Sequence, residues 1–381
     1  MTFEPFLIDV PENVLSDLHD RLARTRWPDQ APHNDPDYGI ELAAVQRLCT
    51  YWRDEFDWKA AQDRLNAFPQ VRGTVDGTGM HAIHVRSAHA NALPLCIIHG
   101  WPGSVAEFEN IIRPLTDPVG HGGSAEDAFH VVCPSIPGYG FSGPTTDRGW
   151  DTVRAADAIH ALMGELGYAT YGLQGGDWGS IISSQIAARH GASITGMHLN
   201  MVVARPPDPA NPLDGVTEEE MADVAALQAF SKNETGYQAI QGTRPQTLAY
   251  GLTDSPAGMA GWILEKFRQW TDCDGDPFAA VTMDQLCTNL TIYWVTGTIN
   301  SSTRLYYESL GPGRGAGYPN SSVPTGCAIF PKELYRAPRV WASERYDVRH
   351  WTRFERGGHF AAMEQPGALV GDMRAFFRLV R

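Results

Sequence analysis

The chain has 381 residues, of which 43% are hydrophobic and 19% charged, a composition that excludes a disordered chain and is typical of a soluble globular protein. Its length exceeds that of a typical single domain, so we expect a large core with an inserted or appended domain. The formal net charge of −14 argues against nucleic acid or an anionic membrane as the main partner.

The first 70 residues predict helices. Apolar residues recur near one helical face in 11–24, and Trp27-Pro28 follows as a stop signal, because the residue before a proline disfavours helix. Residues 40–66 predict one or two further helices. No cluster of reactive side chains occurs in this part, so residues 1–70 are predicted to be an N-terminal helical extension packed on the core.

Residues 71–203 predict the first part of that core. A β-hairpin is expected around Asp76-Gly77, because Asp-Gly is a favoured hairpin turn. The continuous apolar run at 96–98 is typical of a strand buried on both faces, the stretch from His130 predicts another buried strand, and helical patterns alternate with them. This alternation predicts a mostly parallel sheet with helices on both faces and a site at the carboxyl ends of the strands.

The loop His99-Gly100-Trp101-Pro102 follows the first buried strand. A loop that leaves a central strand can supply a backbone N–H group to an oxyanion hole. The Trp101-Pro102 bond is a candidate for the cis form, although most X-Pro bonds are trans. We interpret His99 as a structural histidine that hydrogen-bonds neighbouring loops, not as a catalytic one.

The stretch Gly175-Gly176-Asp177-Trp178-Gly179 lies between an apolar strand and a helix. Its small-x-nucleophile-x-small pattern is that of a nucleophile elbow, where glycines tolerate the crowding of a strand that turns directly into a helix. The central residue is an aspartate, whose carboxylate is already ionised at neutral pH and needs no base before it attacks. Such a nucleophile suits a saturated electrophilic carbon, as in an epoxide or an alkyl halide.

After residue 203 the strand–helix alternation stops, and the proline-rich stretch 205–212 leads into a mainly helical region. Residues 204–320 are therefore predicted to be a lid inserted into the core. Strand patterns return at 323–330 and 350–356, so residues 321–381 are expected to complete the core and to end in a helix.

Asp177, Glu333 and His359 follow one another in the chain, each just past a predicted strand. This is the nucleophile–acid–base order of the α/β-hydrolase fold, in which all three meet at one edge of the sheet. His359 is the expected general base, since an imidazole with a pKa near 6.5 suits proton removal from water. Glu333 would orient the imidazole. Asp347 is an alternative acid, but it precedes the last predicted strand, where the fold does not place the acid.

Several motifs together resemble one family over nearly the whole chain. His99-Gly-Trp-Pro-Gly, Gly175-Gly-Asp-Trp-Gly and Arg356-Gly-Gly-His-Phe-Ala-Ala resemble the core signatures of epoxide hydrolases, specifically the microsomal-type branch. The stretch 243–256 resembles the lid signature of that branch, and parts of 21–69 resemble its N-terminal extension. The resemblance implies an α/β-hydrolase fold with a mostly parallel central sheet, an inserted helical lid and an N-terminal helical extension.

The resemblance also implies two lid tyrosines that protonate the epoxide oxygen. Tyr237 stands just before the lid signature, and Tyr306 matches by its place before Tyr307-Glu308, although Tyr307 is adjacent and stays an alternative. A phenol with a pKa of about 10 keeps its proton until the C–O bond breaks and then donates it to the alkoxide.

The expected reaction has two steps. Asp177 attacks an epoxide carbon to give a covalent ester, and water activated by His359 with Glu333 then hydrolyses the ester to a vicinal diol. The backbone N–H groups of Trp101 and Trp178 are the expected oxyanion hole. No metal or organic cofactor is required.

A haloalkane dehalogenase is the alternative that shares an aspartate nucleophile, and Trp101 and Trp178 are possible halide donors for it. A serine esterase is excluded because no G-x-S-x-G occurs. The stretch 272–276 resembles a calcium loop only faintly, since its glycine is misplaced and Met283 stands at the twelfth position.

The expected substrate is an apolar or aryl epoxide, because the lid is rich in aromatic and apolar residues. The role of the diol, in detoxification or in secondary metabolism, is left open. Six scattered cysteines without a C-x-x-C pair predict free thiols in a reducing cytosol. No signal peptide and no run of about 18 apolar residues is found, so a soluble cytoplasmic protein without the membrane anchor of some relatives is expected. The family resemblance is compatible with a homodimer, and the oligomeric state is left open.

Overall fold

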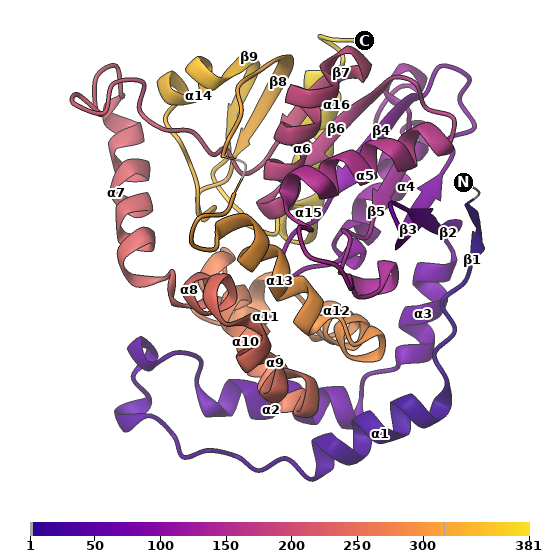
Figure 1. Cartoon of the computed structure of the whole chain (residues 1–381), viewed down its shortest axis with the longest axis vertical. Helices are drawn as coiled ribbons and strands as arrows, with labels where there is room; N and C mark the ends of the chain where they lie inside the picture. Colours follow the sequence, from indigo (N-terminus) through magenta and orange to yellow (C-terminus); the bar gives the residue numbers. More distant parts are fainter. Residues whose placement is uncertain (1–2, 316) are drawn as a thin grey trace.

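A nine-stranded sheet runs through the computed structural model, which describes residues 3–315 and 317–381 (Figure 1). Strands β4 to β9 pair in parallel in the order β5-β4-β6-β7-β8-β9, and β1, β2 and β3 extend the sheet antiparallel beside β5. The strands are β1 Glu4–Phe6, β2 Gln70–Val75, β3 Thr78–Val85, β4 Leu93–Ile98, β5 Phe129–Pro134, β6 Tyr171–Gly175, β7 Ile194–Leu199, β8 Ser321–Ile329 and β9 Tyr346–Arg353. The predicted mostly parallel sheet is confirmed.

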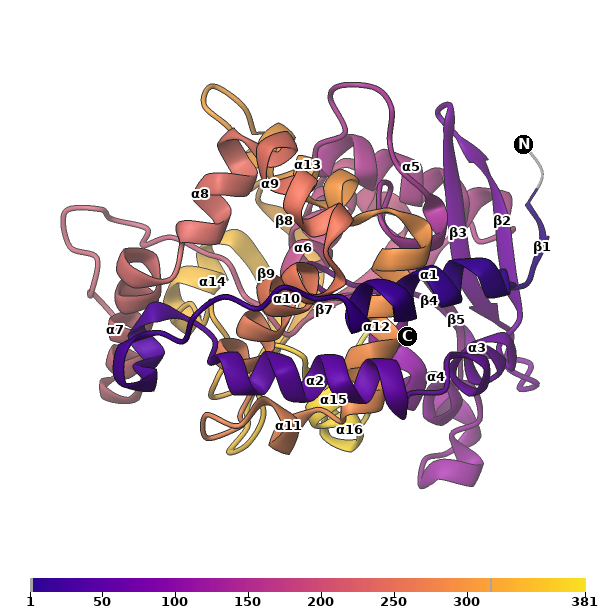
Figure 2. The same ribbon diagram turned by 90° about the horizontal axis from the view of Figure 1, so that it is seen from below.

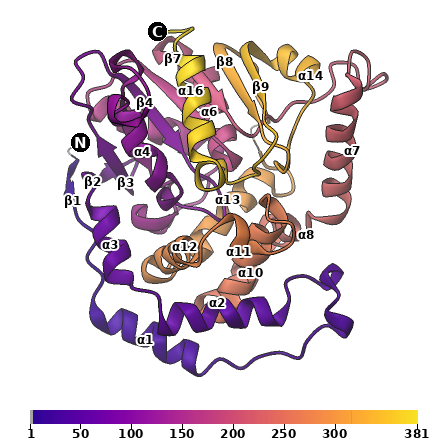
Figure 3. The same ribbon diagram turned by 180° about the vertical axis from the view of Figure 1, so that it is seen from behind.

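Helices cover both faces of the sheet because the central strands are apolar on both sides. In β4, Leu95 and Ile97 pack with α4 and α16, whereas Cys96 and Ile98 lie in the core cluster that contains α5 and α6. Figure 3 shows α4 and α16 on the face opposite to α5 and α6 of Figure 1. The helices of the core are α4 Glu109–Thr116, α5 Thr152–Glu165, α6 Asp177–His190, α14 Arg339–Arg345, α15 Ala361–Glu364 and α16 Pro366–Phe377.

The chain between β7 and β8 is mainly helical. Its helices are α7 Glu218–Asn233, α8 Gly236–Thr243, α9 Pro245–Asp254, α10 Pro256–Trp270, α11 Pro277–Ala280, α12 Met283–Thr296 and α13 Ile299–Leu310. Helices α8 to α13 lie over the carboxyl ends of the parallel strands, as expected for a lid, whereas α7 runs beside the β9 edge of the sheet (Figure 1).

The N-terminal helices contact the lid on the side that faces away from the sheet. Helices α1 Glu12–Ala23 and α2 Leu42–Asp54 run beneath the lid helices in Figure 1 and in front of them in Figure 2, and α3 Trp58–Asn66 lies between them and strand β2. The buried indole N–H of Trp52 donates to Thr291 Oγ1 over 2.8 Å, and the Tyr51 hydroxyl donates to Asp284 over 2.8 Å. The extension therefore contacts the lid more than the sheet, except that strand β1, which the sequence pattern did not indicate, pairs with β2. The division at residues 70, 203 and 320 stays a prediction.

Strand β9 begins at Tyr346, four residues before the predicted start at His350. It is the edge strand of the sheet, and its first four residues include Asp347 and Arg349, which form an ion pair. Polar residues on a half-exposed edge strand hide the strand pattern. In the part of the chain that the structure describes, no helix is both long and apolar enough to cross a membrane.

Gly179 lets α6 approach β4 where the sheet meets the elbow helix. A Cβ atom at this position would lie 1.8 Å from the carbonyl oxygen of Ile98. We expect Gly179→Ala to lower the free energy of unfolding by at least about 3 kcal/mol, the upper end of what overpacking usually costs, because a backbone atom cannot step aside. Urea unfolding measures the effect. Gly164→Ala in α5, where a Cβ would meet open space, is the matched control and should be neutral or slightly stabilising; equal stability of both variants would contradict the prediction.

Candidate active site

Asp177 stands at the turn between β6 and α6, in a backbone conformation that few residues other than glycine adopt. Its φ is +49°, and Gly176 before it is extended. A Cβ atom at Gly176 would lie 2.5 Å from the Asn200 side chain, so only glycine fits there. The carboxylate is thus held at the carboxyl end of the sheet, at the first turn of α6, where the backbone N–H groups have no acceptor within the helix. The predicted elbow is confirmed in its local geometry.

The loop after β4 lies directly against this carboxylate. The backbone N–H of Trp101 donates to Asp177 Oδ1 over 2.8 Å. Gly100 allows this approach, since a Cβ there would lie 2.1 Å from the same oxygen. The Trp101-Pro102 bond is cis. Trp101 is therefore in place to donate to an oxyanion formed at Asp177, and Trp178 supplies a free N–H group in the first turn of α6.

His359 connects Asp177 to Glu333. Its Nε2 lies 3.3 Å from Asp177 Oδ2, and its Nδ1 lies 2.8 Å from Glu333 Oε1 and 3.0 Å from Oε2. A carboxylate only accepts hydrogen bonds, so Nδ1 carries a proton and Nε2 faces the nucleophile. Glu333 is buried and also accepts a 2.6 Å bond from the backbone N–H of Leu334, which fixes its carboxylate. The three residues meet as their positions after β6, β8 and β9 predict.

Electrostatics favour a charged imidazole in the resting enzyme. Burial lowers the pKa of His359, but the carboxylates of Glu333 and Asp177 outweigh it, so that the pKa lies well above the ordinary value.

The loop before His359 is itself anchored, because the Asp272 carboxylate accepts the backbone N–H of Gly357 over 3.0 Å and pairs with Arg356. The stretch 272–276 thus has a structural role, and within residues 3–315 and 317–381 no group of side chains is arranged to hold a metal ion.

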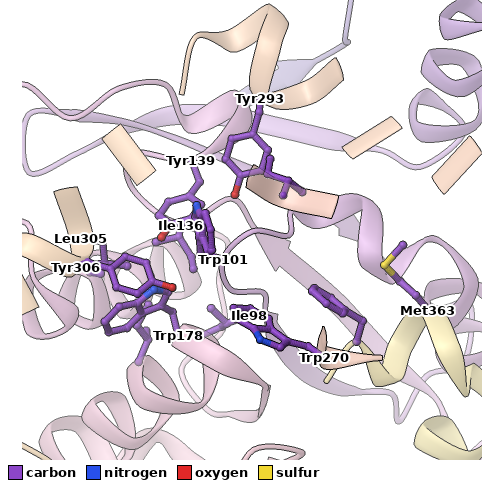
Figure 4. Close-up of a cluster of buried hydrophobic side chains, with 14 of the residues drawn as sticks. Ile98, Trp101, Ile136, Tyr139, Trp178, Trp270, Tyr293, Leu305, Tyr306 and Met363 are labelled. Atoms are coloured by element: carbon purple, nitrogen blue, oxygen red, sulfur yellow. The ribbon is translucent and has the colours of Figure 1, made fainter. Parts of the chain in front are cut away.

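Tyr237 of α8 and Tyr306 of α13 are buried together above Asp177. Their ring centroids are 5.8 Å apart, and Trp101 stacks on Tyr237 at 5.5 Å. Tyr306 packs edge-on against Trp178, with centroids 4.7 Å apart (Figure 4). Burial and the nearby Asp177 carboxylate raise the pKa of Tyr237 well above its ordinary value, and burial, Tyr237 and Asp177 do the same for Tyr306. Both phenols therefore stay protonated at neutral pH.

A cavity of about 110 Å³ brings these groups together. Asp177, Tyr237 and Tyr306 line it, and the remainder of its wall is mostly apolar: Trp178, Ile181, Met201, Val203, Gln238, Leu310, Tyr318, Leu334 and Tyr335. Tyr307 is absent from this wall and instead stacks with Arg314, 4.3 Å from its ring centroid. Of the two adjacent tyrosines, the structure places Tyr306 beside the nucleophile.

A wider cavity of about 620 Å³ adjoins the inner one, with which it shares Trp178, Ile181, Leu310 and Tyr318. Its wall includes the exposed residues Arg205 and Glu344, which place it at the surface. The wider cavity therefore lies between the protein surface and the cavity that contains Asp177.

His99 has the structural role predicted for it, whereas Asp347 lies within β9 and not, as predicted, before the last strand. His99 Nδ1 lies 2.9 Å from the Gly100 carbonyl oxygen, and its Nε2 accepts the Ile136 N–H over 3.2 Å, so it ties two loops together. Asp347 pairs with Arg349 at 2.7 Å on the edge strand and does not take part in the site.

Two lid residues near Tyr237 were not predicted. The Gln238 amide donates to the Tyr237 hydroxyl over 2.9 Å. The Lys266 ammonium lies 4.5 Å from the ring centroid of Tyr237 and is only 6% exposed. Lys266 forms an ion pair with the preceding Glu265. A lysine in a helix with many apolar residues was the available signal, since a buried lysine requires a partner.

Comparisons with known proteins agree with this geometry. Residues 3–108 match the family model described as "Epoxide hydrolase N terminus", and residues 94–278 match the model "alpha/beta hydrolase fold". A putative epoxide hydrolase of Stigmatella aurantiaca is 46% identical over 99% of this chain and 85% of its own length. Epoxide hydrolase 1 of Sus scrofa is 37% identical over 100% of this chain and 89% of its own.

Solved structures match over the whole chain as well. The crystal structure of juvenile hormone epoxide hydrolase from the silkworm Bombyx mori superimposes with a TM-score of 0.91 at 31% identity, covering 100% of this chain and 95% of that one. The epoxide hydrolase of Aspergillus niger gives a TM-score of 0.89 at 28% identity, covering 100% and 97%.

Proposed function

This chain belongs to the epoxide hydrolase family, and we propose that it converts its epoxide to a vicinal diol through a covalent ester on Asp177. The observation that carries the proposal is the cavity in which a carboxylate nucleophile faces two buried phenols, with a histidine–carboxylate pair in contact with the same carboxylate.

The first step is the opening of the ring. An Asp177 oxygen bonds to an epoxide carbon while the ring C–O bond breaks, and the departing alkoxide takes a proton from Tyr237 or Tyr306. Both hydroxyls keep their protons until that point, because burial disfavours the phenolate.

The second step is hydrolysis of the ester. Once ester formation has removed the negative charge of Asp177, His359 loses its Nε2 proton to solvent. As a neutral base it then removes a proton from water while the water oxygen bonds to the Asp177 carbonyl carbon, and the backbone N–H groups of Trp101 and Trp178 stabilise the oxyanion. The ester C–O bond then breaks, the diol oxygen takes the proton back from His359, and the proton left on Asp177 returns to the tyrosinate through solvent. Glu333 holds the imidazole and stabilises its charged form.

The substrate that fits this wall is an apolar or aryl epoxide. Most of the groups that face Asp177 are aromatic or aliphatic, and they offer few hydrogen bonds beyond the two tyrosines. Incubation with styrene oxide, followed by chromatography of the diol, tests the activity. Diol formation is expected; halide release from an alkyl halide with no diol from styrene oxide would contradict the proposal and point to a dehalogenase.

The two tyrosines are expected to share the protonation of the epoxide oxygen. Tyr237→Phe or Tyr306→Phe alone should slow the formation of the ester by about tenfold or more, and the double variant by about 10² to 10⁴-fold, the usual range for general-acid catalysis. Phenylalanine keeps the ring packing against Trp101 and Trp178. Single-turnover kinetics with acid quenching measures the effect. Tyr307→Phe is the matched control and should match the wild type; a loss there equal to that of Tyr306→Phe would contradict the assignment.

A further inference from the structure

A second, smaller cavity also borders Asp177. Its volume is about 20 Å³, and its wall includes Asp177, His359, Glu107 and Asn200 but neither of the two tyrosines. The tyrosine-lined cavity in turn contains neither His359 nor Glu107, so Asp177 separates the two spaces. A volume of this size holds about one water molecule, and the wall offers the several polar partners that a buried water needs.

Glu107 reaches this cavity from the loop after β4 because of a glycine. The residue lies in the short 3-10 turn Val105–Phe108, and its side chain folds back over Gly103. A Cβ atom at Gly103 would lie 1.4 Å from Glu107 Oε1, so no other residue at 103 would leave the carboxyl group where it is. In the helix that follows, α4, Asn110 is exposed and Glu109 forms an ion pair with Arg64.

The surroundings of Glu107 favour a neutral carboxyl group. Burial raises the pKa of Glu107 to about 8; His359 acts in the opposite direction, and the Asp177 carboxylate adds to the rise. A carboxyl group that keeps its proton both donates and accepts a hydrogen bond, so it can orient a water molecule beside Asp177.

We propose that Glu107 is a catalytic residue of the second half-reaction, in which it holds, together with His359, the water molecule that hydrolyses the Asp177 ester. The inference rests on the ester mechanism proposed above. One O–H bond of the water points to His359 Nε2, which takes that proton as the water oxygen bonds to the ester carbonyl carbon. Glu107 transfers no proton; it fixes the position of the oxygen on the face of Asp177 opposite to the tyrosines.

A purely structural role for Glu107 has a different signature. Ser104-Val-Ala-Glu107 has the Ser-x-x-Glu pattern of a helix-capping box, and a hydrogen bond from the Ser104 backbone lowers the pKa of Glu107. Loss of a cap would destabilise the loop that carries Trp101 and would therefore slow both half-reactions. Loss of a water partner slows only the second.

The test separates the two half-reactions in a rapid-mixing single turnover with styrene oxide, with the covalent adduct followed by intact-protein mass after acid quenching. For Glu107→Leu we expect an unchanged rate of adduct formation and a hydrolysis rate reduced by about 10- to 100-fold, the cost of a misplaced reactant. Glu107→Gln, which keeps a donor and an acceptor, should retain most of the hydrolysis rate.

Two further variants keep the test decisive. Gly103→Ala should give the same selective loss, because its methyl group displaces the Glu107 carboxyl, and it serves if Glu107→Leu fails to fold. Glu109→Leu, two residues along the same segment, should behave as the wild type. His359→Gln must accumulate the adduct if the ester mechanism holds; if it does not, the proposed function fails. If it does, while Glu107→Leu slows both steps equally or neither, the role of Glu107 is overturned.

Discussion

Replacing Asp177 by alanine is expected to lower kcat/KM for styrene oxide by at least about 10⁴-fold, because the variant lacks the only carboxylate that faces the two tyrosines among the residues that line the inner cavity. The remaining wall can still bind and polarise the epoxide, but nothing in it can form the ester. Steady-state diol formation measures the loss, and intact-protein mass should show no adduct at any time.

The fold of this variant is expected to persist. Asp177 makes one hydrogen bond to Trp101 and one contact with His359, and its φ of +49° costs alanine about 1 kcal/mol, a small part of the stability of a domain. Thermal unfolding within a few degrees of the wild type is the required control. A well-folded Asp177→Ala protein that retained more than a hundredth of the activity would refute the assignment of the nucleophile.

Replacing His359 by glutamine is expected to stop the reaction halfway. Ring opening needs Asp177 and the tyrosines, so the ester should form, whereas its hydrolysis should slow by about 10² to 10⁴-fold without a general base. The protein mass should rise by one substrate molecule within the first turnover and stay there. Rapid turnover without an adduct, or no reaction at all in a folded variant, would each contradict the claim that His359 is needed for hydrolysis of the ester but not for its formation.

The charges around His359 explain how the first step of the reaction prepares the imidazole for the second. In the resting enzyme Glu333 and Asp177 raise the pKa of His359 well above its ordinary value, so the imidazole is charged at neutral pH. Ester formation removes the charge of Asp177, and with it one of the interactions that raise the pKa. His359 therefore becomes a better base at the moment when water must be deprotonated.

The imidazole of His359 acts as a base only when it is neutral. The rate of ester hydrolysis should therefore fall as the pH falls through the pKa of His359 in the ester, while ester formation persists to lower pH.

Sequence patterns were sufficient for the parts of the site that depend on the ends of strands. Asp177, Glu333 and His359 each follow a strand, and parallel strands bring their carboxyl ends to one edge, so their meeting follows from topology alone. The glycines around Asp177 also predicted a strained turn at this residue, and the Asp177 φ of +49° confirms it.

Other features depend on packing that no local pattern encodes. Tyr306 and Tyr307 are adjacent on α13, where neighbours point about 100° apart, and only the contact of Tyr306 with Trp178 decides which of them faces Asp177. Strand β1 has only three residues, and its partner β2 begins 64 residues later, at Gln70. Glu107 was not predicted, because its Ser-x-x-Glu pattern is typical of a helix cap. Its carboxyl group reaches the site only because residue 103 is a glycine and has no Cβ atom in its way.

The covalent ester is tested most directly by a single turnover with styrene oxide in water enriched in heavy oxygen, followed by mass analysis of the peptide that contains Asp177 and of the diol. Because water attacks the carbonyl carbon of the ester, the label is predicted to enter the Asp177 carboxylate, and the diol of the first turnover is predicted to carry an unlabelled oxygen from Asp177. Label in the diol with none in Asp177 would mean that water attacks the epoxide directly, and would contradict the central claim.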